Sequence, residues 1–319
     1  MKLGVLTVPL YGMELEEAVS YLNGLGVQMI ELGGGCYPGN THTLPYITGE
    51  KPIFELKAML DKYNMGVSAI ALQGNQVHPD PEIAAKFQKE FEEGILLAEK
   101  LGVDTVNVFS GAPGGSPDDK TPNWVTCPWP DDFLKVLDYQ WNDVLIPYWK
   151  KAVEFGKAHG VTKFGFEMHP GFCVYNTETL LKLREAVGPE IGANFDPSHL
   201  IWQGMDIVQA IKELKGAIFH FHAKDTRLDK ANIARIGVLD NKSYGDIANR
   251  AWVFRSVGYG NDQFFWKEVV TALQTIGYDG TMSIEHEDGM MSIKEGLEKA
   301  IECLKSALVF EKPAEMWWA

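Results

Sequence analysis

The feature that most constrains the fold of this chain is the regular alternation of short apolar runs with longer segments of helical periodicity. The apolar and β-branched runs predict strands that begin near Lys2, Val27, Val67, Val103, Val161, Ile191, Ala217 and Thr281. Amphipathic segments follow them near 13–25, 52–64, 81–101, 138–159, 176–187, 205–214, 262–276 and 291–309. The sequence therefore predicts eight consecutive strand–helix units.

Glycine stands between a predicted helix and the next strand at several of these junctions. The pairs are Gly26-Val27, Gly66-Val67, Gly102-Val103, Gly160-Val161 and Gly277-Tyr278. Because glycine readily adopts the left-handed conformation that ends many helices, we expect each of these glycines to terminate the helix before it. The pairs support the same division of the chain into units.

Repeated strand–helix units predict parallel strands joined by right-handed crossovers. Eight such units in 319 residues are typical of a (β/α)8 TIM barrel, and no domain boundary is evident, so we predict one barrel domain over residues 1–319. An open doubly wound sheet is the alternative. That fold usually has a glycine-rich phosphate loop after its first strand, and residues 7–12, Thr-Val-Pro-Leu-Tyr-Gly, lack this motif.

Three of the predicted loops that follow strands are long. They span residues 33–51 after strand 2, 110–131 after strand 4 and 226–261 after strand 7. Loops longer than about 12 to 15 residues are usually either functional or disordered. Since the loops after the strands build the active-site face of a TIM barrel, we expect these three to act as lids over a site.

The charge of the chain argues against nucleic acid as a partner. It has 29 Lys and Arg against 43 Asp and Glu, a formal net charge of −14, whereas nucleic-acid binding needs a basic surface. No run of 18 apolar residues is present, so we predict no membrane-spanning helix. The four cysteines form no close pair, which fits a protein of the reducing cytoplasm.

Polar residues alternate with apolar ones at the ends of the last four predicted strands. One face of each strand carries, in chain order, Glu167 and His169; Asn194 and Asp196; His220, His222 and Lys224; and Ser283, Glu285 and Glu287. Because successive side chains of a strand point to opposite faces, we expect the apolar neighbours to pack under the helices and these polar residues to point into the barrel. Buried charges persist only when they are paired, hydrogen-bonded or bound to a metal.

Four of these residues form a candidate set of metal ligands: Glu167, Asp196, His222 and Glu285. Three carboxylates with one imidazole suit Mn²⁺ or Mg²⁺ better than structural Zn²⁺, so we predict one divalent cation and favour manganese. Each residue alone has a simpler interpretation, as a solvated Glu at a strand edge, an Asp that caps the next helix or a His bonded within the core. The coincidence of four successive strand ends favours the metal.

Neighbouring polar residues are assigned supporting roles. His220 is expected to orient the metal site or the barrel interior rather than to bind metal. Lys224 and Asp225 are expected to form an internal ion pair, and Glu31 is expected to anchor a loop.

These motifs resemble the xylose-isomerase-like barrel family of sugar isomerases, epimerases and dehydratases, over essentially the whole chain. The family's metal ligands are Glu, Asp, His and Glu on strands 5 to 8, the positions of the four predicted ligands, and residues 196–199 match its Asp-x-x-His. The resemblance implies that His199 and Arg227 hold substrate oxygens. The spacing from His222 to Arg227 departs by about one residue from that of similar family members, which makes Arg227 the less secure assignment.

A narrower resemblance points to one subgroup. Residues 33–40 and 283–288 are similar to those of a subgroup that includes the α subunits of C-glycoside deglycosidases, which act on 3-oxo glycosides with a metal and a nearby His. Glu167-Met168-His169 supplies a Glu-x-His of this kind, which implies a catalytic role for His169. The resemblance also implies an oligomer with a small β subunit. The apolar segment Met316-Trp317-Trp318 is expected to cover a groove or a partner subunit.

The predicted activity is removal of a proton next to a sugar carbonyl. A metal stabilises the resulting negative charge, and Glu167 and Glu285 can approach a bound sugar from opposite sides, as an isomerase or epimerase requires. A leaving group at the next carbon would make the same site a lyase that cleaves a 3-oxo glycoside, with His169 as an additional acid or base.

Two other functions compete with this prediction. A non-catalytic carbohydrate-binding protein could use the metal only to organise its pocket. An endonuclease-type phosphodiesterase barrel should carry more His and Asp ligands and a basic surface, and the charge of −14 argues against it.

Overall fold

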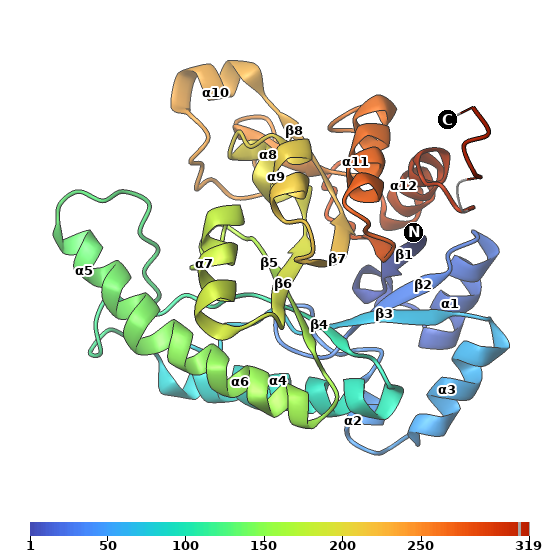
Figure 1. Ribbon diagram of the computed structural model, residues 1–319, viewed down its shortest axis with the longest axis horizontal. Coiled ribbons are helices and arrows are strands. Elements are labelled where there is room, and N and C mark those ends of the chain that lie inside the picture. The colour runs from blue at the N-terminus through green and yellow to red at the C-terminus, as the bar shows by residue number, and fades with distance from the viewer. Residues whose placement is uncertain (312–313, 319) are drawn as a thin grey trace.

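A computed structural model describes residues 1–311 and 314–318 of the chain (Figure 1). Within these residues, eight parallel strands close into a barrel in the order β1-β10-β7-β6-β5-β4-β3-β2. They are β1 (Lys2–Leu6), β2 (Met29–Gly33), β3 (Gly66–Ala71), β4 (Thr105–Val108), β5 (Lys163–Glu167), β6 (Ile191–Phe195), β7 (Ile218–Ala223) and β10 (Thr281–Ile284). The predicted (β/α)8 barrel is confirmed, and the open sheet is excluded because β1 pairs with β10.

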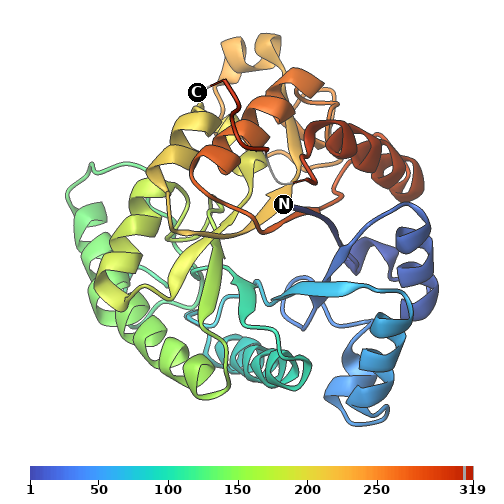
Figure 2. The same ribbon diagram turned by 45° about the vertical axis from the view of Figure 1, so that its right-hand side comes forward.

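Helices surround the ring of strands, as Figure 2 shows. They are α1 (Leu15–Gly24), α2 (Leu44–Ile47), α3 (Ile53–Lys62), α4 (Pro81–Leu101), α5 (Asp132–Asp138), α6 (Ile146–Ala158), α7 (Thr177–Val187), α8 (Pro197–Trp202), α9 (Ile207–Glu213), α10 (Lys230–Ile236), α11 (Gln263–Thr275) and α12 (Ile293–Ala307). A 3-10 turn, η1 (Val8–Leu10), follows β1, and a π-helical turn, η2 (Tyr139–Leu145), joins α5 to α6. None of the described helices is both long and apolar enough to cross a membrane.

The glycines before the strands have two different roles. Left-handed backbone, with φ between 73° and 84°, is found at Gly26, Gly102, Gly160 and Gly277. The expectation is wrong for Gly66, because Asn64 (φ 49°) takes the left-handed conformation there. Gly66 begins β3, and a Cβ at this position would lie 2.5 Å from Met29 Sδ of the neighbouring strand. Glycine is needed at Gly66 for close packing rather than for ending a helix.

The apolar residues of the strands point outward, under the helices. Trp149 of α6 is fully buried, and its ring packs edge-on against Phe166 of β5 with centroids 4.5 Å apart. Phe164, two residues earlier, lies on the same face. The outward direction of these rings leaves Glu167 to point into the barrel, as the alternation predicted.

The long segment after β7 has its own structure. β8 (Asp225–Leu228) and β9 (Trp252–Arg255) form an antiparallel pair. The segment that connects the two strands contains α10, which lies at the top of Figure 1. Trp252 stacks on Trp202 of α8 at 4.7 Å, and the buried guanidinium of Arg250 lies 4.5 Å from the Trp252 ring. These contacts fix the segment against the barrel.

Candidate active site

The carboxyl ends of β5, β6, β7 and β10 bring the predicted metal ligands together. One donor atom from each of Glu167, Asp196, His222 and Glu285 lies within 4.8 Å of those of the other three. The first three side chains are at most 3% exposed, whereas that of Glu285 is 14% exposed. Solvent therefore reaches the cluster at Glu285.

Glu167 is held through both of its carboxylate oxygens. Oε1 lies 3.0 Å from His199 Nε2, and Oε2 accepts a hydrogen bond from Gln73 Nε2 at 3.1 Å. Burial alone would raise the pKa of Glu167, but the hydrogen bonds from His199 and His222 outweigh it and hold that pKa well below its usual range. Glu167 is thus an ionised carboxylate in a fixed orientation.

His222 is oriented by a carboxylate from β2. Its Nε2 lies 2.9 Å from Glu31 Oε2, and Glu31 also accepts hydrogen bonds from Asn107 and Ser283. With Nε2 donating to Glu31, Nδ1 is the free nitrogen that faces Glu285 at 3.0 Å. Carboxylates orient metal-binding histidines in this way. The expectation that Glu31 anchors a loop is wrong, because the residue is fully buried inside the barrel.

His220 belongs to the barrel interior, as expected. Its Nδ1 lies 2.9 Å from Asn194 Oδ1 and its Nε2 lies 3.1 Å from Ser68 Oγ. Glu31, His220 and His222 also lie close enough together to be considered as ligands. Both nitrogens of His220 are engaged in these hydrogen bonds, however, whereas Asp196 Oδ2 and His222 Nδ1 make none of suitable geometry in the described chain. We therefore place the metal in the group formed by Glu167, Asp196, His222 and Glu285.

Lys224 lies among the carboxylates of the site. Its Nζ is 3.0 Å from Asp196 Oδ2, 2.8 Å from Glu285 Oε2 and 3.0 Å from Glu287 Oε2. The expected ion pair with Asp225 is wrong, because adjacent residues point to opposite faces of the chain. Asp225 instead accepts hydrogen bonds from backbone N–H groups of the segment before α11.

Two buried donor atoms of the ligand set, Asp196 Oδ2 and His222 Nδ1, make no hydrogen bond of suitable geometry within the described chain. Burial raises the pKa of Asp196 to about 7, against the attraction of Lys224. The pKa of His222 is raised well above its usual value despite burial, because Glu31 and Glu285 attract its proton. The cluster thus favours added positive charge at this point, and its oxygens and nitrogen fit a divalent cation.

His169 and His199 lie together beside Glu167, with ring centroids 4.1 Å apart. His199 is buried and its Nε2 lies 3.3 Å from Asp196 Oδ2. His169 Nδ1 lies 2.6 Å from the carbonyl oxygen of Pro170, to which it can donate. Because Nδ1 is used in that hydrogen bond, Nε2 is the nitrogen of His169 that can accept a proton or a hydrogen bond from a ligand.

Arg227 is not brought to the cluster. It lies on β8, where it pairs with Val253, and its side chain is exposed. The prediction that Arg227 holds substrate oxygens remains a prediction. The basic side chain that lies buried beside the carboxylates is instead that of Lys224.

A cavity of about 470 Å³ lies above the cluster. It is lined by Leu6, Val8, Pro9, Tyr11, Tyr37, Pro38, Gln73, Phe109, Glu167, His169, Lys224, Glu285, His286, Glu287 and Ile293. Ionised carboxylates, a lysine and aromatic rings therefore face one cavity that is open to solvent, which is the usual character of a ligand site.

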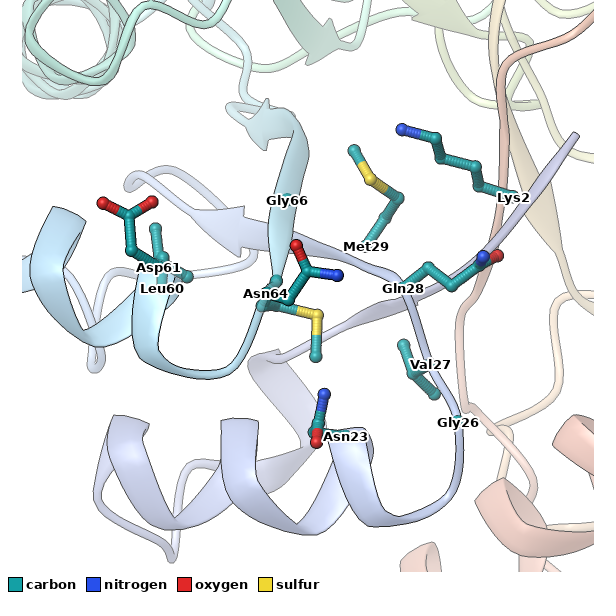
Figure 3. A pocket seen from close by; sticks show the side chains of 11 residues that line it. Lys2, Asn23, Gly26, Val27, Gln28, Met29, Leu60, Asp61, Asn64 and Gly66 are labelled. Carbon is teal, nitrogen blue, oxygen red and sulfur yellow. The ribbon is translucent and has the colours of Figure 1, made fainter.

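Another hollow, of about 580 Å³, lies at the opposite face of the barrel (Figure 3). Its lining residues come from the starts of β1, β2 and β3 and from the ends of α1 and α3, and Lys2 and Asp61 are its charged members. These two side chains supply no ligand set. Active sites of TIM barrels lie at the carboxyl ends of the strands, so we assign the site to the other face.

Glu31 and Gln73 belong to the site although neither is predicted from the sequence to take part in it. Glu31 is a lone charge between Ile30 and Leu32 in an otherwise apolar strand. A carboxylate at such a buried position indicates a polar partner inside the barrel, because a buried charge is stable only when it is paired or hydrogen-bonded. Gln73, just beyond β3, carried no comparable signal.

We expect Glu31→Gln to weaken Mn²⁺ binding by about 10- to 100-fold, because the neutral amide no longer stabilises the His222 orientation. Calorimetric titration of Mn²⁺ measures this change. Glu268→Gln, an exposed position on α11, is the matched control and should leave the affinity unchanged. Equal affinities for Glu31→Gln and the unchanged protein would contradict the role given to Glu31.

The chain is similar in sequence and in structure to known proteins. The family described as "Xylose isomerase-like TIM barrel" matches residues 19–307. The chain belongs to this family. Among its relatives, YfiH of Bacillus subtilis (strain 168), named an uncharacterized protein, is 39% identical over 312 residues, which cover 97% of this chain and 99% of YfiH.

Other similar proteins are described by an activity or by a bound metal. Inosose dehydratase of Geobacillus thermodenitrificans (strain NG80-2) is 31% identical over 123 residues, 38% of this chain and 39% of that protein. The solved structure of IolI protein, described with a binding zinc atom, superimposes with a TM-score of 0.65 at 19% identity and covers 96% of each chain. At that identity, the likeness to IolI establishes the shared fold.

Proposed function

We propose that the chain is a divalent-metal-dependent carbohydrate enzyme that removes a proton next to a sugar carbonyl. It would act either as an isomerase or epimerase or as a lyase that cleaves a 3-oxo glycoside by elimination. The observation that carries the proposal is the convergence of Glu167, Asp196, His222 and Glu285 below a cavity, with two buried donor atoms that lack a hydrogen bond of suitable geometry in the described chain. Membership of a family of xylose isomerase-like barrels supports it.

The four converging residues would hold the cation. When bound, a divalent ion supplies a Lewis acid that polarises a carbonyl oxygen. We propose Mn²⁺, because the set has three carboxylates and one imidazole. Zn²⁺, which the IolI structure contains, and Mg²⁺ are the ions to compare with it.

The residues around the cavity would divide the remaining work. Glu167 and Glu285 come from β5 and from the end of β10, so their carboxylates can remove and return a proton on different sides of a bound sugar. The buried ammonium group of Lys224 lies beside Glu285 and lines the cavity, where it can stabilise negative charge on a substrate oxygen. His199 fixes Glu167 by a hydrogen bond.

An isomerase and a lyase would share the first step, in which a carboxylate removes a proton next to the sugar carbonyl. In an isomerase, a proton returns to carbon. In a lyase, the electron pair left on carbon forms a double bond as the bond to the leaving group breaks, and the departing atom would be protonated by His169 after its Nε2 has taken up a proton from solvent. The distant inosose dehydratase relative is named for an elimination reaction, which keeps the lyase reading alongside the isomerase reading.

Solvent deuterium exchange tests the proposal. We expect the Mn²⁺-loaded protein to incorporate deuterium from D₂O next to the carbonyl of a ketose or of methyl 3-oxo-β-D-glucopyranoside, and the chelated protein to lose this activity. Mg²⁺ and Zn²⁺ are compared in parallel. Absence of metal-dependent exchange into every ketose and 3-oxo glycoside tested would contradict the proposed reaction.

We also propose a cytoplasmic protein that forms an oligomer, with a small β subunit if it belongs to the deglycosidase subgroup. Trp317 and Trp318 are 88% and 69% exposed, so they cover no groove among residues 1–311 and 314–318 of their own chain. Native mass spectrometry of the purified protein would measure subunits and metal content together.

A further inference from the structure

Lys224 makes two of its three ion pairs with members of the predicted metal-ligand set. Its Nζ lies 3.0 Å from Asp196 Oδ2 and 2.8 Å from Glu285 Oε2, and the lysine side chain is only 2% exposed. A buried ammonium group is stable only where negative charge surrounds it. The carboxylates that would hold a metal ion therefore already hold a positive charge, which the chain itself supplies.

The oxygens that Lys224 contacts are the ones that a metal ion would need. Asp196 Oδ1 accepts a hydrogen bond from Ser198 N, so Oδ2 is the oxygen of Asp196 that remains for a cation. Glu285 Oε2 also lies 3.0 Å from His222 Nδ1, the nitrogen that faces the ligand set. A divalent ion bonded to these oxygens would share them with an ammonium group of the same sign, and like charges that are shielded from water repel strongly.

A second set of groups can receive the ammonium group. Glu287 Oε2 lies 3.0 Å from Lys224 Nζ, and Glu287 does not belong to the ligand set. The centroid of the Phe254 ring lies 4.8 Å from the same nitrogen, a distance at which a ring face attracts a cation. Lys224 and Glu287 both line the cavity above the carboxylates. The lysine can therefore leave Asp196 and Glu285 without losing every partner.

We propose that Lys224 is the internal counter-ion of the metal-free site, and that its ammonium group leaves Asp196 and Glu285 for Glu287 when a divalent cation binds. Glu287 is then a positioning residue, because it affects the metal only through Lys224. The inference rests on the metal site of the proposed function and adds the device that sets its metal affinity. In the metal-loaded protein the ammonium group would be free to face a substrate oxygen in the cavity.

Lys224→Met tests the inference in a calorimetric titration with Mn²⁺. Methionine keeps a long unbranched side chain without the charge, so we expect Mn²⁺ to bind at least about tenfold more tightly to this variant. Lys267→Met, at an exposed position on α11, is the matched control and should bind Mn²⁺ as the unchanged protein does. Unchanged or weaker binding by Lys224→Met would overturn the inference.

Glu287→Gln tests the group that receives the lysine. The amide carries no negative charge for the displaced ammonium group, so Mn²⁺ should bind at least about threefold more weakly. The same substitution made in Lys224→Met should leave the affinity unchanged, because no ammonium group remains to be received. An equal loss in both backgrounds would show that Glu287 acts directly on the metal and would overturn its assignment as a positioning residue.

Thermal unfolding of the metal-free and Mn²⁺-loaded forms is an independent measurement. Lys224→Met leaves buried carboxylates without this counter-charge, so the melting temperature of the metal-free form should fall by at least about 4 °C. With Mn²⁺ bound, the fall should be less than about half as large, because the cation supplies the charge. A fall of equal size in both forms would mean that Lys224 serves folding alone, which would overturn the inference. Should the metal-free variant not fold, removal of Mn²⁺ from the loaded variant by a competing chelator gives its affinity.

Failure of this inference is distinguishable from failure of the proposed function. Deuterium exchange by the unchanged protein, without tighter Mn²⁺ binding by Lys224→Met, overturns only the inference. Tighter binding by Lys224→Met, without exchange in any form of the protein, supports the inference and overturns the proposed reaction. Absence of Mn²⁺ binding in the unchanged protein and in all variants overturns both.

Discussion

Asp196→Asn is expected to lower metal affinity by at least about 100-fold, more than loss of a residue that only orients a ligand. Asp196 Oδ2 is a buried oxygen that makes no hydrogen bond of suitable geometry in the described chain and lies 3.0 Å from Lys224 Nζ, so it is placed to exchange this ion pair for a bond to the cation. The other oxygen, Oδ1, accepts from Ser198 N at 2.8 Å and caps α8. Asparagine can keep this cap, because its Oδ1 is also an acceptor. The variant should fold normally, and its metal content can be measured by elemental analysis after dialysis.

Asp206→Asn is the matched control for that variant. Asp206 caps α9 in the same way, with Oδ1 accepting from Gln209 N at 2.9 Å, but it is exposed and lies outside the site. We expect its metal content to equal that of the unchanged protein. Retention of a full equivalent of metal by Asp196→Asn would remove this residue from the ligand set.

Glu285→Gln is expected to slow deuterium exchange by about 10² to 10⁴-fold, the usual contribution of a positioned general base. Glu285 is suited to the role because its carboxylate is the most exposed of the four and lines the cavity. Burial would raise its pKa, but Lys224 and His222 outweigh burial and lower that pKa to about 2, so Glu285 is ionised at neutral pH. Glu167→Gln should have a comparable effect, and exchange followed by NMR measures both.

Sugar binding by these variants separates an enzyme from a carbohydrate-binding protein. An enzyme whose base is removed should bind methyl 3-oxo-β-D-glucopyranoside within about tenfold of the unchanged protein while exchange is lost. A binding protein should show no metal-dependent exchange in any form. Glu268→Gln on α11 controls for the loss of one carboxylate elsewhere. Exchange at the full rate in Glu285→Gln would contradict its assignment as a base.

The alternation rule accounts for why much of the site was predictable. Phe164 and Phe166 must pack under α6, which leaves Glu167 no direction but inward. The same reasoning placed Asp196 and His222 beside it. A barrel brings successive strand ends to one mouth, so the convergence of these residues followed from the fold.

The sequence does not show which elements far apart in the chain come into contact, and this limits the prediction of the site. Glu31 contacts His222 only because the barrel closes through pairing of β1 with β10, and strand spacing alone does not identify such a partner. The expected ion pair between Lys224 and Asp225 is wrong for a different reason, because alternation alone places Asp225 on the other face. Arg227 lies on β8, and neither β8 nor its pairing with β9 was predicted within the long segment after β7.

Crystallography of the Mn²⁺-loaded protein at the manganese absorption edge tests the central claim most directly. The structure predicts one anomalous peak at the mouth of the barrel, within bonding distance of Glu167, Asp196, His222 and Glu285. A peak elsewhere, or a cluster that stays metal-free at saturating Mn²⁺ with Lys224 and His222 as its counter-charges, would contradict the proposed metal centre.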